Sequence, residues 1–206
     1  MIPRRFSGSS LVELLLALAV VAVLVAIALP RYERAQVRSK VSQARADLRT
    51  FAQALEAYAV DYKKYPGDGA MYSWTYPRPP YDYFWYLPST LTTPVAYANS
   101  VSLEDPFRAA AQMPLNYRRY RYTYVDMTWG TAGTRYSPSQ YYEFLKGFYG
   151  SWKLNSAGPD GTFGPYYPTD TYPGNRYPEL QLPYDPSNGT ISPGDILRSQ
   201  RSPLSE

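Results

Sequence analysis

A run of nineteen apolar residues near the N-terminus restricts the fold of this chain more than any other feature. Over residues 11–29, every position except Glu13 is Ala, Val, Leu or Ile. As an α-helix the run is about 28 Å long, and the apolar core of a bilayer is about 30 Å thick. The alternative is a cleaved secretory signal peptide, but its apolar region has only about 7–15 residues and ends at a small-residue cleavage site. Pro30 and Arg31 follow here. The run therefore predicts a membrane-spanning helix.

Glu13 is the one carboxylate inside this apolar run. An unpaired carboxylate at membrane depth costs about 2.5–3.5 kcal/mol, so a cation is expected beside it. Gly8 is the only glycine before the run. Cleavage after Gly8 would give Ser9 a free amine that could neutralise Glu13 of a neighbouring copy. The alternative is that Glu13 lies solvated among the lipid headgroups.

The segment over residues 4–15, RRFSGSSLVELL, resembles the class III signal of type IV pilins and type II secretion pseudopilins. That family has a short basic leader, glycine immediately before the cleavage site, glutamate at the fifth mature position and proline at the twenty-second. Counted from Ser9, Glu13 is the fifth residue and Pro30 the twenty-second. The first mature residue is usually Phe or Met in the family, whereas here it is Ser9.

The resemblance implies a domain organisation and a set of partners. Residues 1–8 would be a leader removed by a prepilin peptidase, with N-methylation of the new N-terminus. Residues 9–30 would be the transmembrane and assembly helix, 31–65 an amphipathic helix packed on the head, and 66–206 an extracytoplasmic head. The precursor would lie in the bacterial inner membrane. An inner-membrane assembly platform would then add it to a helical homopolymer, in the periplasm or on the cell surface.

The distribution of basic residues predicts the opposite orientation. Two arginines precede the apolar run, and five basic residues follow it closely: Arg31, Arg34, Arg38, Lys40 and Arg45. The positive-inside rule would keep the C-terminal part in the cytoplasm. We give the motif more weight, because pilin-like precursors keep the short leader cytoplasmic and translocate the rest.

Helical periodicity continues beyond Pro30. Apolar residues follow at spacings of three and four: Val37, Val41, Ala44, Leu48, Phe51, Leu55, Tyr58 and Tyr62. Pro30 deletes the hydrogen bond to the carbonyl of Ala26, which predicts a kink or local melting there. The sequence KKYPG at 63–67 predicts the end of the helix. A lone coiled-coil strand is the alternative, but more than 130 residues follow and need a core.

The remaining residues, 66–206, are rich in turns, and the whole chain holds 23 tyrosines and 20 prolines. The aromatic and proline-rich stretch 68–94 predicts loops or short helices held by ring packing. Alternation over 117–125 predicts a strand, and 148–154 is a second candidate strand. We expect an α+β fold, with a small antiparallel sheet of three or four strands against the C-terminal half of the helix.

The composition excludes several classes of function. The chain has no Cys and no His, so thiol nucleophiles, disulfides, Cys/His metal sites and Ser-His-Asp catalysis are excluded. No pair of carboxylates stands out for glycosidase chemistry. An enzyme is therefore not expected.

Arg and Tyr alternate over residues 117–122 and could stack on single-stranded nucleic acid. A strand with one buried face explains the same pattern. The net charge of +4 falls to +2 without the leader (19 basic minus 17 acidic residues), and the other charges are scattered. No nucleic-acid partner is expected.

The C-terminal loops could hold a cation. Asp and Asn beside Gly are first of all turn residues, yet Ca²⁺ takes six to eight oxygens from such loops. The block SAGPDG at 156–161, with the later Asp195, resembles the calcium loop of the major pseudopilin of type II secretion. That resemblance implies Asp160, Asp195 and the carbonyl of Leu154 as ligands; Asp185 is a weaker candidate. The family's loop between the two aspartates is short, whereas 34 residues intervene here. Calcium is a candidate cofactor.

Two functional hypotheses follow. The first is a structural filament subunit, a pilin or pseudopilin, assembling through its N-terminal helix, and the surplus of tyrosines suits lateral packing between subunits. The second is a membrane-anchored module whose aromatic head captures a polysaccharide or another protein. Such a module works as a monomer and needs neither Gly8 nor Glu13.

Overall fold

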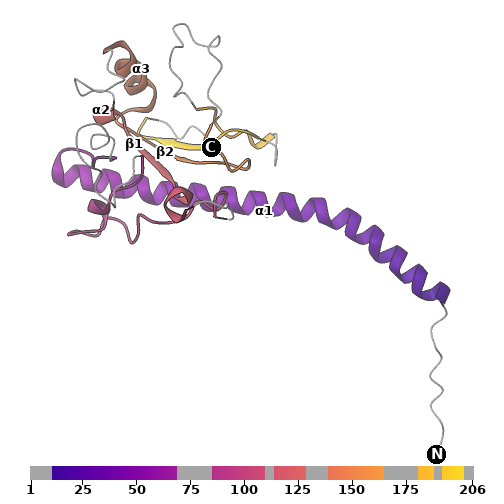
Figure 1. Ribbon diagram of the computed structural model, residues 1–206. Coiled ribbons are helices and arrows are strands. Elements are labelled where there is room, and N and C mark those ends of the chain that lie inside the picture. The colour runs from indigo at the N-terminus through magenta and orange to yellow at the C-terminus, as the bar shows by residue number, and fades with distance from the viewer. Residues whose placement is uncertain are drawn as a thin grey trace, which may run out of the picture. The chain divides into compact units, whose positions relative to one another are not determined.

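The computed structural model of the chain describes residues 11–68, 85–109, 114–128, 139–164, 181–187 and 192–201 (Figure 1). The chain divides into two compact units, Met1–Arg38 and Ser39–Glu206. The predicted segments 9–30 and 31–65 meet at Pro30, eight residues before this division.

Helix α1, Leu11–Tyr62, contains 52 residues, and the helical assignment continues through Pro30 without local melting (Figure 1). The helix ends where the sequence predicts. Lys63 has a φ of 57°, and its N–H donates to the carbonyl of Ala59 at 2.9 Å. Its Nζ donates to the carbonyl of Val60 at 2.8 Å, so one side chain and one left-handed residue satisfy carbonyls of the last turn.

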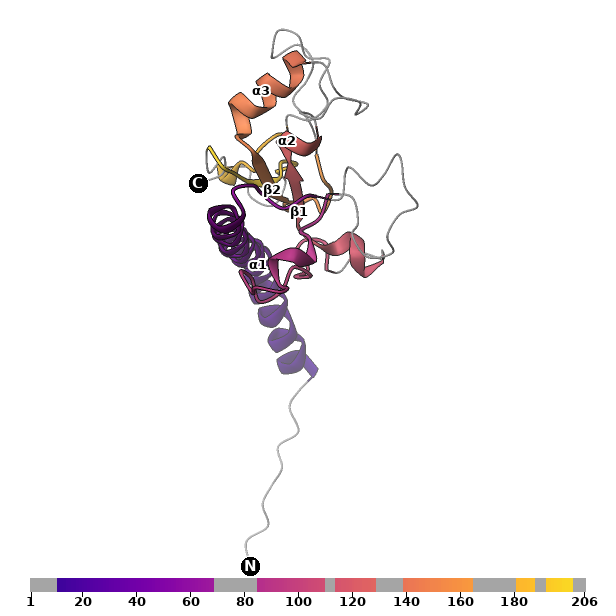
Figure 2. The same ribbon diagram turned by 90° about the vertical axis from the view of Figure 1, so that its left-hand side faces the viewer.

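Three short strands form one antiparallel sheet in the order β1-β2-β3: β1 Arg121–Tyr124, β2 Trp152–Ser156 and β3 Ile196–Ser199. In the register, Leu154 pairs with Tyr122 on one side and with Arg198 on the other. Figure 2 shows β1 and β2 side by side. The predicted α+β fold with a small antiparallel sheet is confirmed, and a long apolar N-terminal helix before such a sheet is a pilin-like architecture.

The predicted strand over 117–125 is too long at both ends. A 3-10 helix, η3 (Leu115–Arg118), occupies its beginning, where the N–H of Tyr117 donates to the carbonyl of Pro114 at 2.9 Å. Helix α2, Val125–Thr128, follows the strand directly. The alternation of Tyr and Arg therefore lies on a strand only over four residues.

The predicted strand over 148–154 is wrong in its first half. Residues 148 and 149 end helix α3, Ser139–Tyr149. Leu145 and Tyr149 are buried at a spacing of four, which is a helical repeat that sequence analysis missed. Gly150, with a φ of 81°, ends the helix, and β2 begins two residues later.

Of the proline-rich stretch 68–94, residues 69–84 lie outside the described part of the chain. The remainder contains a 3-10 helix, η2 (Ser89–Leu91), as predicted for this region. Three apolar side chains here are buried in the head: Tyr86, Leu87 and Leu91.

The core of the second unit lies between the sheet and α1. The helix buries one stripe, as its periodicity predicts: Val41, Ala44, Leu48, Phe51, Ala52, Ala54, Leu55 and Tyr58. The last residue of the predicted stripe, Tyr62, is exposed. The rings of Phe51 and Tyr120 meet edge to face, with centroids 5.7 Å apart. Polar contacts flank them: the Tyr120 hydroxyl donates to Asp47 at 2.7 Å.

Substituting Phe51 by alanine tests this contact. The ring is 1% exposed, so its removal leaves a cavity between helix and sheet. We expect a loss of about 3–5 kcal/mol and a fall in the thermal midpoint of about 6–20 °C, measured by circular dichroism of the full chain in detergent. Val60→Ala is the control, since Val60 is 66% exposed and its truncation should change stability by about 0.5 kcal/mol or less. Equal shifts for the two variants would contradict the packing.

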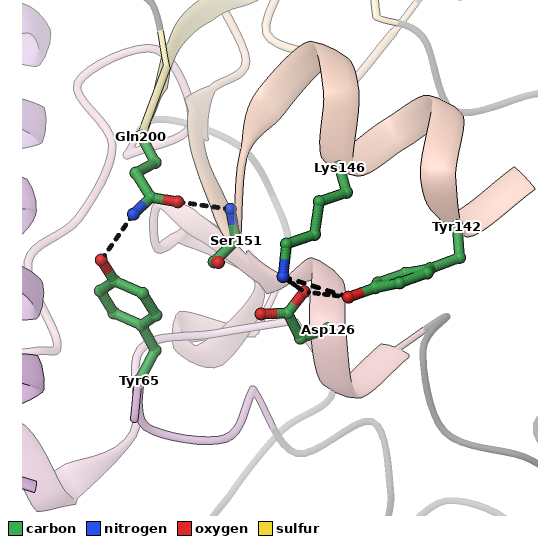
Figure 3. A network of polar contacts seen from close by, with 6 residues as sticks. All are labelled: Tyr65, Asp126, Tyr142, Lys146, Ser151 and Gln200. Carbon is green, nitrogen blue, oxygen red and sulfur yellow. Dashed lines mark hydrogen bonds and ion pairs between the residues drawn. The ribbon is translucent and has the colours of Figure 1, made fainter. Parts of the chain in front are cut away.

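Helix α3 is tied to α2 by polar side chains (Figure 3). Lys146 and Tyr142 of α3 both bond Asp126 of α2, Lys146 as an ion pair and Tyr142 through its hydroxyl at 2.7 Å. Lys146 and Asp126 keep 34% and 25% of their side-chain surface exposed, so the ion pair adds little to the free energy of unfolding. Its main effect is to orient α3 on α2.

Gln200, just after β3, joins the sheet to the end of α1 (Figure 3). Its Oε1 accepts from the N–H of Ser151 at 2.6 Å, and its Nε2 donates to the Tyr65 hydroxyl at 2.8 Å. That hydroxyl donates in turn to Glu56 of α1 at 2.8 Å. The end of β3 is therefore fastened to the C-terminal end of the helix.

Candidate functional site

The N-terminal part of α1 is an apolar surface without cover from the described residues. Every residue over 11–29 is exposed, from 74% for Leu11 to 52% for Ile27 among the large side chains. The segment is long and apolar enough to cross a membrane. A helix that is apolar all round needs an apolar environment on every side.

Glu13 is exposed and lies in the first turn of α1. Near this end the helix dipole favours a negative charge. Pro30 lies within the same helix, immediately after the apolar run. The predicted processing residues Gly8 and Ser9 lie outside the described residues, so cleavage stays a prediction.

A shallow apolar hollow lies on this part of the helix. It is lined by Ala19, Val20, Val23 and Leu24, which occupy one helical face over two turns. The small side chain of Ala19 lets another helix approach more closely than its larger neighbours would.

The predicted calcium ligands lie in different surroundings. Asp195 is fully buried. Its Oδ2 accepts from the side-chain amides of Asn155 at 3.0 Å and Gln181 at 2.7 Å, and its Oδ1 accepts from the N–H of Gly164 at 3.2 Å. Burial raises the pKa of Asp195 to about 7, although the donors on Gly164 and Asn155 lower it.

Asp160 lies close enough to Asp195 for its charge to raise the pKa of that carboxyl, but neither Asp160 nor Leu154 shares its buried side-chain environment. Asp160 is exposed, and its two oxygens accept from the N–H and the hydroxyl of Thr162, both at 3.0 Å, as in a turn. Leu154 lies in the central strand, paired on both sides, where backbone carbonyls belong to the sheet. Among the described residues, no group of three or more carboxylate, His or Cys side chains is arranged as metal ligands. Calcium binding stays a prediction.

The weaker candidate, Asp185, is exposed at a turn. Its Oδ1 accepts from the N–H of Ser187 at 2.8 Å, and these hydrogen bonds from Ser187 lower the pKa of Asp185. The carboxylate therefore serves a local turn.

Asp105 is a buried carboxylate that sequence analysis missed. Its Oδ1 accepts from Ser156 Oγ at 2.9 Å and from the N–H of Phe107 at 3.0 Å. Its Oδ2 accepts from the N–H of Ala157 at 2.7 Å, and burial raises its pKa. Asp105 thus anchors the start of the 156–161 block. Asp followed by Pro106 and Phe107 indicates a turn, but no sequence signal joins it to a segment fifty residues away.

Arginines of the basic and aromatic run 117–122 stack on aromatic rings of the head itself. The guanidinium of Arg119 lies over the ring of Tyr86 at 4.8 Å. Arg121 lies over the rings of Trp85 at 5.2 Å and Phe163 at 4.1 Å. These rings offer to arginine the faces on which nucleic-acid bases would stack. The arrangement fits a structural role for the run.

Residues 3–29 match the family model described as the prokaryotic N-terminal methylation motif. This motif is typical of type IV pilins and pseudopilins, a structural class of protein. No curated protein and no solved structure matches the chain. The motif and the apolar helix coincide on one segment, which makes the N-terminal part of this chain pilin-like. They are also consistent with an inner-membrane precursor.

Proposed function

We propose that this protein is the structural subunit of an extracytoplasmic type IV filament, a pilus or a secretion pseudopilus. One observation carries the proposal: the methylation motif at 3–29 coincides with a helix that is apolar and exposed on all sides over 11–29. Lipid covers this apolar surface before assembly, and copies of the same helix cover it in the filament.

The contacts between copies decide whether assembly is favourable. When a subunit leaves the membrane, its helix exchanges contacts with lipid for contacts with other helices, so little hydrophobic free energy is gained. Close packing between the helices therefore has to supply the free energy that favours assembly. The hollow at Ala19 and Val23 is a place where a neighbouring side chain would fit. A filament core of such helices requires close approach along this face.

Glu13 would set the register of the polymer. After cleavage behind Gly8, the amine of Ser9 on one subunit would pair with the Glu13 carboxylate of the next. A buried ion pair adds little net stability, but one mismatched register would leave a charge unpaired in an apolar core. We therefore assign Glu13 a role in specificity. A prepilin peptidase and an inner-membrane assembly platform are the partners that this role requires.

Cysteine cross-linking in the native cell envelope tests the proposal, because the chain has no cysteine of its own. Pairs of cysteines placed one to two turns apart within 14–29, such as Leu16→Cys with Leu24→Cys, should give a ladder of covalent oligomers on oxidation. Each single variant can go no further than the dimer, because one thiol per chain forms only one disulfide. Monomers and dimers from every pair tested would contradict a polymer and favour the membrane-anchored binding module.

A further inference from the structure

The part of the head that resembles a calcium loop contains a chain of buried polar side chains: Lys153, Gln181, Asp195 and Asn155. We call these four residues the Asp195 cluster. Lys153 Nζ donates to Gln181 Oε1 at 3.2 Å, and Gln181 Nε2 donates to Asp195 Oδ2 at 2.7 Å. The four residues are between 0% and 4% exposed. A continuous path of hydrogen bonds thus joins an ammonium to a carboxylate inside the head.

The cluster joins three segments that are distant in sequence. Lys153 and Asn155 lie on β2, Asp195 precedes β3, and Gln181 begins the described segment 181–187. The N–H of Asp195 donates to the carbonyl of Leu182 at 2.9 Å. These segments are the ones that a bound cation would have to hold together.

The backbone of these segments is already in contact. A Cβ added at Gly158 would lie 2.3 Å from the carbonyl oxygen of Gly194. A Cβ added at Gly194 would lie 2.3 Å from the carbonyl oxygen of Pro183. The ends of the loop therefore meet directly, through glycines that permit the approach.

The donors around Asp195 do not suit a cation. Calcium takes six to eight oxygens, whereas both carboxylate oxygens of Asp195 face N–H groups. Rotating the Gln181 amide would turn its oxygen toward Asp195, but its NH₂ group would then face Lys153. An ammonium has no acceptor, so Lys153 fixes the amide in its present orientation.

A positive charge is already present near Asp195: burial and the nearby Asp160 raise the pKa of this carboxyl, whereas the Lys153 ammonium lowers it. A buried ammonium and a buried carboxylate each need an opposite charge nearby. Lys153 also lies over the ring of Tyr149 at 4.9 Å, which holds its ammonium beside the cluster. A divalent cation at Asp195 would add two positive charges next to this ammonium. The residues present therefore do not fit calcium at this position.

We infer that Lys153, acting through Gln181, balances the charge of Asp195 in the place that the pseudopilin resemblance assigns to calcium. The C-terminal part of the head closes by a protein-only network and needs no divalent cation. This inference does not depend on the filament role, since it concerns the fold of the head alone.

The first test compares thermal unfolding of the full chain in detergent, with excess EDTA and with excess calcium. Calcium bound at a hundred times its dissociation constant would raise the midpoint by about 5–10 °C. We expect the same midpoint in both conditions. A saturable rise with calcium that disappears in Asp195→Asn would overturn the inference. A rise of equal size in wild type and Asp195→Asn would place the cation elsewhere and leave this account of Asp195 supported.

The second test removes the ammonium. Lys153→Met keeps much of the aliphatic stem and should lower the midpoint by about 6–20 °C, because Asp195 loses the positive charge nearby. Lys146→Met is the matched control, and loss of its partly exposed pair with Asp126 should change the midpoint by about 4 °C or less. The double variant Lys153→Met with Asp195→Asn should lose less than the sum of the two single changes. Additive losses would contradict the coupling; if a variant fails to fold, the wild-type comparison of EDTA with calcium still decides.

Discussion

Replacing Glu13 by glutamine is expected to leave the protein in the membrane and to reduce assembled filament at least about tenfold. Glutamine keeps the length of the side chain and removes its charge. The apolar run is unchanged otherwise, so insertion into the membrane should proceed. What is lost is the partner of the Ser9 amine, which would be buried without an opposite charge in the filament core.

The measurement is the ratio of covalent oligomer to monomer in the cysteine cross-linking experiment, with membrane content followed in parallel. Glu33→Gln is the matched control, because Glu33 is an exposed glutamate on the same helix, just beyond the apolar run. It should assemble as the wild type does. A normal ladder from Glu13→Gln would remove Glu13 from the assembly mechanism.

Replacing Gly8 by valine is expected to prevent processing and, with it, assembly. In the pilin-like resemblance, glycine precedes the cleavage site, and a β-branched residue there should exclude the peptide from the peptidase. The uncleaved chain keeps Arg4 and Arg5 next to the apolar run and has no Ser9 amine to offer to Glu13. Both effects oppose extraction from the membrane, since charges are costly at membrane depth.

Precursor and processed forms differ by eight residues and are distinguished by intact mass. Gly147→Val is the matched control, because a Cβ at Gly147 meets no atom within 4 Å. The control should be processed normally. Complete processing of Gly8→Val would show that the cleavage site lies elsewhere. Glu13→Gln should be cleaved yet unassembled, so the two variants separate processing from assembly.

Local periodicity predicted the helical part of this fold well. Spacings of three and four marked the buried stripe of α1, and Lys63 with Pro66 marked its end. These signals are local, because one face of a helix is visible in a dozen neighbouring residues. The antiparallel sheet was also foreseen, but its strands are shorter than the alternation suggested.

Contacts between distant segments could not be predicted in the same way. Lys153 alternates with Trp152 and Leu154 on β2, a pattern that predicts an exposed lysine, yet it is 4% exposed. Gln181 and the ring of Tyr149 are partners of its buried ammonium, and nothing in the sequence joins Lys153 to Gln181. Asp105 is a similar case, since its carboxylate accepts hydrogen bonds from Ser156 and Ala157, which lie in a distant segment.

The tyrosines occupy both surface and core positions. Some lie on the surface, as their number predicts, including Tyr32, Tyr62 and Tyr117. Others are core residues with a bonded hydroxyl: Tyr122 is fully buried and donates to the carbonyl of Pro66 at 2.7 Å. A tyrosine can take either position, because its ring packs and its hydroxyl needs one partner. Composition alone therefore cannot assign them.

The N-terminal mass of the protein recovered from its native cell envelope tests the central claim most directly. The proposed function predicts a chain that begins at Ser9, with or without a methyl group on its amine, in both the membrane and the cross-linked oligomers. A chain that begins at Met1 in every fraction would contradict prepilin processing, and a permanently anchored binding protein would then be the better account.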